Sequence, residues 1–178
     1  MADESLKLTG VKMEYTFLRE QFLKRVEMRH TVVELTLTIA AAFLGVAFTK
    51  AVPSSIALVF PPIAYFLALE WMYIDIRQAQ TIKYLLKLEI KIPELELGWE
   101  EFKQSGGGFR YAIGSHGGVF IFTQILAMIV GFLRYDEGTN NWAFVNDLPS
   151  VFAIFLFIDC VCFIFTFVMF IERTRRSS

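Results

Sequence analysis

Cysteine is scarce in this 178-residue chain, and the only two, Cys160 and Cys162, lie together in the last apolar run. Residues two apart on a helix point to different faces, so these two thiols cannot form an ordinary disulfide with each other. We interpret both as small, polarizable packing residues. A disulfide framework is therefore not expected to support the fold.

Motifs of common enzyme classes are also lacking. The glycine-rich segment from Ser105 to Gly108 does not end in the Gly-Lys-Ser/Thr of a phosphate-binding loop, and no zincin motif occurs. No nucleophile and base stand at a recognisable spacing. His30 and Glu34 are four residues apart, but two ligands are too few for a metal site. We therefore expect neither an enzyme nor a bound metal or cofactor.

What the chain has in excess is apolar surface. Hydrophobic residues make up 55% of it and aromatic residues 16%, including 19 Phe, and the mean hydropathy is +0.49. This composition lies outside the range of ordinary soluble domains. The net charge of -1 conceals a pattern, because charged residues gather between the apolar runs. The composition predicts one membrane domain and argues against direct binding of nucleic acid.

Four apolar stretches approach the length of a membrane-spanning helix. A helix rises about 1.5 Å per residue, so roughly 20 residues cross the hydrocarbon layer. The third stretch has glycines near its start and a short uninterrupted apolar part. We predict an all-α membrane protein, a four-transmembrane-helix bundle, with spans at Thr31–Thr49, Ile56–Tyr73, Ser115–Leu133 and Leu148–Ile171.

The basic residues indicate an orientation, because lysine and arginine near the ends of spans stay in the cytoplasm. The two loops on the opposite side hold only Lys50 and Arg134. We expect a multi-pass protein of the cell's inner membrane, without a cleavable signal and with both termini cytoplasmic. The basic residues of the cytoplasmic segments are Lys7, Lys12, Arg19, Lys24, Arg25, Arg29, Arg77, Lys83, Lys87, Lys91, Lys103, Arg110, Arg173, Arg175 and Arg176.

Helical patterns continue beyond the first two spans. Apolar residues recur at helical spacing from Met13 to His30, and again from Ile76 to Ile90 until Pro93. We therefore predict cytoplasmic helical extensions of the first and second spans, and a kink or broken turn at Pro61 and Pro62. The predicted organisation is an N-terminal amphipathic helix at 1–30, a hairpin at 31–75, a helix with a glycine-rich linker at 76–114, a second hairpin at 115–171 and a basic tail at 172–178.

Asp159 is the most unusual polar residue, since it falls near the middle of the fourth span. An ionisable group at that depth costs on the order of 2.5 to 3.5 kcal/mol. Gln124 lies at a similar depth in the third span and could share hydrogen bonds with it. One interpretation is an interhelical polar contact that stabilises by about 0.6 to 2 kcal/mol. The other is an ion or proton pathway in an oligomer.

Glu34 and Glu70 form a second candidate pair, because antiparallel spans place both near the cytoplasmic boundary. They could reach the interface or pair with Arg29 and Arg77. Alternatively, they could form a ring of carboxylates that selects cations at a pore mouth. The remaining charges expected at this boundary are His30 and Asp75.

The layout from Tyr15 to Trp99 is a basic helix that enters a hairpin of spans and returns as a long cytoplasmic helix. This layout resembles the small bacterial membrane effectors of phage-defence operons, including the SLATT type. The resemblance covers roughly half of the chain, and the third and fourth spans depart from the two-span SLATT plan. Pore formation is the function that the resemblance implies.

We therefore predict a homo-oligomeric membrane protein that forms or gates a pore, controlled through its cytoplasmic helices. Close approach of helices, as the spacing of Ala41 and Gly45 permits, would serve packing within one chain or between copies. Two alternatives remain open. One is a non-conducting anchor or sensor that recruits a cytosolic protein through residues 13–30 and 76–102, and the other is an accessory subunit of a larger membrane complex.

Overall fold

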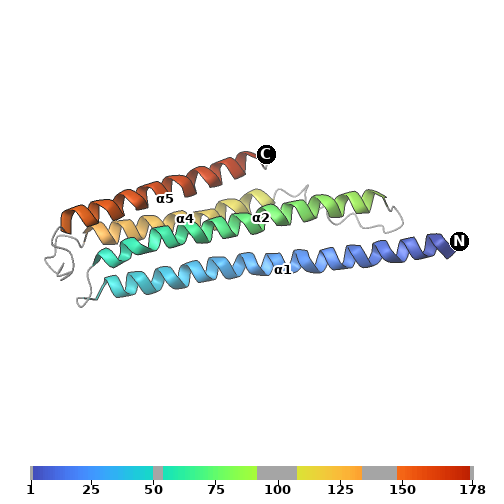
Figure 1. The fold of residues 1–178 in the computed structure, drawn as a ribbon, viewed down its shortest axis with the longest axis horizontal. Coiled ribbons are helices and arrows are strands. Elements are labelled where there is room, and N and C mark those ends of the chain that lie inside the picture. Colours follow the sequence, from blue (N-terminus) through green and yellow to red (C-terminus); the bar gives the residue numbers. More distant parts are fainter. Residues whose placement is uncertain (1, 50–53, 92–107, 134–147, 177–178) are drawn as a thin grey trace. The chain divides into compact units, whose positions relative to one another are not determined.

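The computed structural model describes residues 2–49, 54–91, 108–133 and 148–176. Four long α-helices and one short 3-10 helix make up these ranges, and no strand occurs in them (Figure 1). The predicted all-α class is confirmed. In chain order the elements are α1 (Ala2–Ala47), η1 (Ser54–Val59), α2 (Phe60–Lys91), α4 (Gly108–Leu133) and α5 (Leu148–Arg176).

Each long helix contains a stretch that is long and apolar enough to cross a membrane. The stretches extend over Thr9–Ala47, Ile56–Glu89, His116–Leu133 and Phe152–Arg175. They contain most of the four predicted spans, so the count of four candidate membrane helices agrees with the sequence. The first two stretches extend well beyond the length needed for the hydrocarbon layer, because α1 and α2 are longer than one span requires.

Helix ends follow the proline and glycine positions. The chain changes from 3-10 to α-helix at Phe60, so Pro61 and Pro62 stand in the first turn of α2, where a missing N–H breaks no helical hydrogen bond. Pro149 takes the same position in α5. Helix α4 begins at Gly108, earlier than the expected span. Most of the predicted glycine-rich linker and Pro93 lie outside the described residues.

Contacts divide the chain into two compact units. Unit 1 comprises Met1–Thr31 and Trp71–Phe109, and unit 2 comprises Val32–Glu70 and Arg110–Ser178. Helices α1 and α2 each contribute residues to both units. The unit boundaries in these two helices lie within a few residues of the expected cytoplasmic ends of the first two spans.

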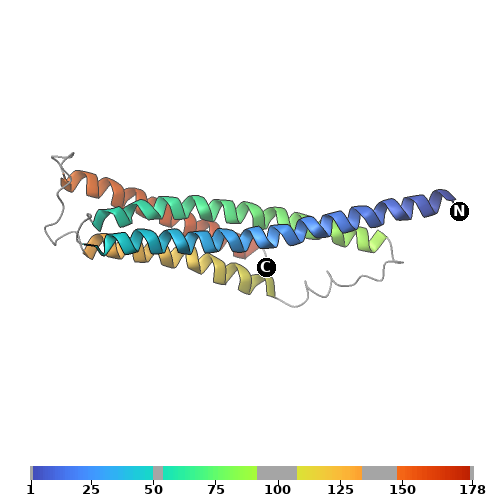
Figure 2. The ribbon, with the colours of Figure 1, turned by 90° about the horizontal axis from the view of Figure 1, so that it is seen from below.

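In unit 1, the first part of α1 and the last part of α2 lie side by side and run antiparallel (Figures 1 and 2). The Tyr15 hydroxyl lies 2.9 Å from Oε1 of Glu89, and Arg29 contacts Asp75 two heptads later on α1 and two heptads earlier on α2. A seven-residue period keeps one seam of each helix facing its partner. The buried residues of these seams include Tyr15, Phe22 and Arg29 on α1, and Trp71, Gln78 and Leu85 on α2.

In unit 2, small side chains bring three helices together. Ala40 of α1, Ala64 of α2 and Ala127 of α4 form one buried cluster with Phe60. A second cluster joins α1, η1 and α4 through the buried side chains of Ala47, Ala57 and Val130. Alanine at these contacts lets helix backbones approach closely, which is the usual packing of membrane helices.

Two glycines of α4 are sites of close contact within unit 2. A Cβ at Gly117 would lie 2.7 Å from Cδ1 of Phe170, and a Cβ at Gly131 would lie 2.5 Å from Cδ2 of Leu58. The Phe170 ring also stacks on Phe120, with centroids 6.1 Å apart. Since Leu58 is fully buried, it has little room to move away from a new methyl group.

We expect Gly131→Ala to lower the thermal unfolding temperature of the purified protein, because overpacking a filled core costs about 1 to 3 kcal/mol. Gly118→Ala is the matched control on the same helix, since a Cβ there meets nothing within 4 Å. The control should be neutral or slightly stabilising, because alanine favours helix over glycine. Equal unfolding temperatures for the two variants would contradict this account of α4 packing.

Candidate functional site

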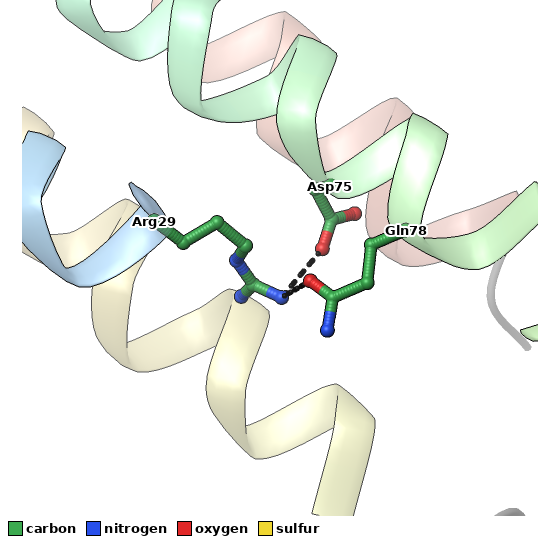
Figure 3. Close-up of polar contacts among 3 residues, drawn as sticks. All are labelled: Arg29, Asp75 and Gln78. Carbon is green, nitrogen blue, oxygen red and sulfur yellow. Dashed lines mark hydrogen bonds and ion pairs between the residues drawn. The ribbon is translucent and has the colours of Figure 1, made fainter. Parts of the chain in front are cut away.

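A buried polar cluster in unit 1 joins α1 to α2, and we call Arg29, Trp71, Asp75 and Gln78 the Arg29 cluster. The Arg29 guanidinium contacts Oδ1 of Asp75 through Nη1 at 3.1 Å and donates from the same nitrogen to Oε1 of Gln78 at 2.9 Å (Figure 3). Its Cζ lies 4.5 Å from the centroid of the Trp71 ring. Three residues of α2 therefore hold one side chain of α1.

The Arg29 cluster is almost completely withdrawn from solvent. Arg29 is 9% exposed, and Asp75 and Trp71 are fully buried. Burying two opposite charges stabilises a fold only when the charges contact each other and their remaining polar atoms are satisfied. Gln78 and the aromatic face of Trp71 add such contacts to the guanidinium. The geometry suits a specific clamp between two helices, and the cluster contains no nucleophile for covalent chemistry.

Other polar contacts in unit 1 extend the same antiparallel pairing. Arg25 donates to the carbonyl oxygen of Arg77 at 3.1 Å and to the Thr81 hydroxyl. The Tyr84 hydroxyl donates to Oε1 of Glu14 at 2.8 Å. A shift of α1 along α2 would break several of these bonds together.

Two of the predicted boundary charges lie outside the Arg29 cluster. His30 is exposed on α1. The Arg77 side chain is exposed on α2, where its Nε donates to the Tyr73 hydroxyl at 3.2 Å and its Cζ lies 5.4 Å from the Tyr73 ring centroid. The four charges grouped by the sequence thus separate into a buried pair, Arg29 and Asp75, and two exposed side chains.

Glu34 and Glu70 are both exposed, and both belong to unit 2. Their pairing with Arg29 or Arg77 stays a prediction. Within unit 1, the Arg29 guanidinium contacts Asp75 and Gln78. The buried carboxylate of Asp75, one turn from Gln78, contacts Arg29 inside the seam of unit 1. Glu34 and Glu70 occupy outward positions of their helices.

The polar residues predicted in the second hairpin are buried in unit 2. Nε2 of Gln124 donates to the Thr166 hydroxyl at 3.2 Å, and that hydroxyl donates to the Cys162 carbonyl at 2.8 Å. Asp159 is fully buried, and neither of its carboxyl oxygens has a hydrogen-bond partner among the described residues.

The expected hydrogen bond between Asp159 and Gln124 is absent because the two residues differ in level. Gln124 pairs with Thr166 on antiparallel α5, and Asp159 lies about two turns before Thr166. The same antiparallel register places Gly131, two turns beyond Gln124, near the level of Asp159. Position within the predicted spans placed Asp159 and Gln124 at a similar depth but missed this axial offset.

Sequence reasoning missed Trp71, Gln78 and Thr166 as members of polar contacts. The signal that could have found them is periodicity, since residues seven apart share one face of a helix in a coiled pair. Gln78 lies one heptad after Trp71, and Thr166 lies one heptad after Asp159. The residues that the structure describes contain no group of three or more metal-ligating side chains.

We expect Asp75→Leu to destabilise the protein by about 3 to 5 kcal/mol, because Arg29 would remain buried without its counter-charge. The double variant Arg29→Leu with Asp75→Leu should recover most of this loss, since paired apolar residues can replace a buried ion pair. Thermal and denaturant unfolding of the purified protein measures both. Additive effects of the two single changes would argue against coupling between these side chains.

No family model, curated protein or solved structure matches this chain, so the argument for its function depends on the geometry described above.

Proposed function

We propose that this chain inserts into the inner membrane and forms or gates a pore as an assembly of several identical copies. The observation that carries the proposal is one exposed face of α1. Glu34, Thr38, Ala41 and Gly45 are all exposed in the single chain and belong to unit 2. Their spacing of four, three and four residues places them on one face of the helix.

This face is unsuited to lipid. Glu34 lies near the predicted cytoplasmic boundary, where a carboxylate is better accommodated by water or another protein surface than by lipid. Ala41 and Gly45 offer lipid little apolar surface but let another helix approach closely. This face carries polar side chains at one end and small side chains at the other. It fits contact between copies around a water-filled path, with Glu34 near the mouth of that path.

Asp159 has a different place in the proposal. Because Asp159 is fully buried within one copy, we propose a passage between copies that Asp159 does not line. We assign the ion-selecting role to Glu34, and we interpret Asp159 as an interior polar group of unit 2. The large exposed hydrophobic residues of α5, such as Phe157, Phe165 and Val168, fit a surface that faces lipid.

The orientation in the proposal follows the basic residues and places both termini in the cytoplasm. Unit 1 would then project from the membrane, where a partner or a second copy can reach it. Its Arg29 cluster fixes α1 against α2 at one register, because polar groups inside a helix seam penalise alternative registers. We propose that control of the pore passes through this helix pair.

A second candidate function is a membrane anchor that recruits a cytosolic protein. It is favoured by Met13 and Phe17 on α1 of unit 1, which are 69% and 59% exposed. They lie one turn apart and line a shallow depression with Lys12 and Glu20. An apolar pair beside charges of both signs is typical of a surface that a partner helix could cover.

The selectivity test uses purified protein in planar bilayers, with the ratio of cation to anion permeability as readout. We expect Glu34→Gln to lower cation preference and Glu34→Lys to favour anions, because the charge at the mouth is removed or reversed. Glu27→Gln is the control, an exposed acid of α1 in unit 1 that is not placed at the pore mouth. Wild-type protein that assembles but shows no conductance would favour the anchor instead.

The assembly test changes Gly45, at the end of the face that carries small side chains. We expect Gly45→Leu to reduce the number of copies in the purified complex, because the added side chain separates helices that meet there. A Cβ at Gly45 meets nothing within 4 Å in the single chain, so folding should be preserved. Ala153→Leu on exposed α5 is the control, and mass measurement in detergent is the readout. A monomeric wild type would refute the proposal.

A further inference from the structure

Unit 2 contains a groove of about 330 Å³ between the first half of α4 and the last turns of α5. Gly118 and Ile121 line it from α4, and Phe167 and Ile171 line it from α5. Arg175 lines the groove at the C-terminal end of α5. The volume is at the lower end of the range found for small-molecule sites, which is about 300 to 1,000 Å³.

The groove is already formed in the single chain. The absence of a side chain at Gly117 lets the Phe170 ring approach α4, and stacking against Phe120 at an interplanar angle of 22° holds this ring in place. Gly118, the next residue, has open space where a Cβ would stand. One glycine therefore admits the ring that forms the wall, and its neighbour leaves the groove empty of protein atoms.

The lining changes from apolar to basic along α5. Phe167, Ile171 and Thr174 lie at successive turns of one helix face, and Arg175 follows. From Phe167 to Arg175 the helix rises by about 12 Å. The C-terminal turns of α5 carry three arginines, Arg173, Arg175 and Arg176, and one acid, Glu172, which does not line the groove. The basic end therefore favours an anion.

A lining that is apolar first and basic at its end matches an amphiphile that lies along α5. We propose that the groove binds one acyl chain of an anionic phospholipid, whose phosphate is held by the Arg175 guanidinium. A guanidinium matches phosphate geometry through paired N–H donors. The inference depends on α4 and α5 spanning the membrane, as in the proposed function, but it does not depend on pore formation.

The test measures lipid adducts of the purified full-length chain by native mass spectrometry. Phosphatidylglycerol and diacylglycerol with identical acyl chains are titrated separately, because diacylglycerol lacks the phosphate. We expect one phosphatidylglycerol per chain at concentrations about tenfold below those needed for diacylglycerol, the difference that one charge-assisted hydrogen bond supplies. Equal binding of the two lipids to the wild type would overturn the assignment of the headgroup.

Two variants test the apolar groove and the Arg175 guanidinium separately. Gly118→Leu should abolish binding of both lipids, because the new side chain fills the groove from a position with free space. Arg175→Gln should leave acyl binding but remove the preference for phosphatidylglycerol. Ala153→Leu, an exposed position of α5 that does not line the groove, is the control and should bind as the wild type does. Unchanged lipid binding in Gly118→Leu would overturn the proposal.

Two further results would also decide what occupies the groove. If Gly118→Leu alters the number of copies without changing lipid binding, a second copy occupies the groove and the lipid proposal is wrong. If Gly118→Leu does not fold, Ile121→Trp fills the same groove from the next turn of α4, and its loss of lipid binding supports the proposal while unchanged binding overturns it. Because conductance is not the readout, failure of the pore proposal remains distinguishable from failure of this one.

Discussion

The antiparallel packing of α1 on α2 in unit 1 depends on one buried ion pair, Arg29 with Asp75, set into a seam of seven-residue period. Hydrophobic residues in such a seam tolerate sliding by a heptad, since each layer resembles the next. A buried charge does not, because any other register leaves it without its counter-charge. The ion pair thus selects one alignment of the two helices, which an apolar seam alone would not.

The same distinction between inward and outward positions organises the functional proposal. Arg29 and Asp75 satisfy each other inside unit 1, whereas Glu34 is exposed on the small, polar face of α1 in unit 2. Buried and paired charges stabilise a structure, while an exposed carboxylate in an apolar helix demands water or another protein surface. In the proposed assembly, neighbouring copies would provide both at the Glu34 face.

Small residues decide how the helices of unit 2 can meet. Alanines at the α1, α2 and α4 contacts permit close backbone approach, and Gly117 and Gly131 admit Phe170 and Leu58. In lipid, association depends on such packing because water does not drive apolar helices together. Gly118 shows the opposite use of glycine, since its missing side chain leaves a groove whose chemistry runs from aromatic to basic.

The sequence by itself determined the number of apolar helices, the continuation of the first two helices beyond the predicted spans, and the place of proline in the first turns of α2 and α5. These features follow from length, hydropathy and proline chemistry, which act locally. The sequence also singled out Asp159, Gln124 and the charges near the ends of the spans as unusual. Only the tertiary structure decided which of them meet: Gln124 bonds to Thr166 and Arg29 bonds to Asp75, while Glu34 and Glu70 are exposed. Partner choice depends on the rotation and axial register of helices that are distant in sequence, and a shift of one residue turns a side chain by about 100°.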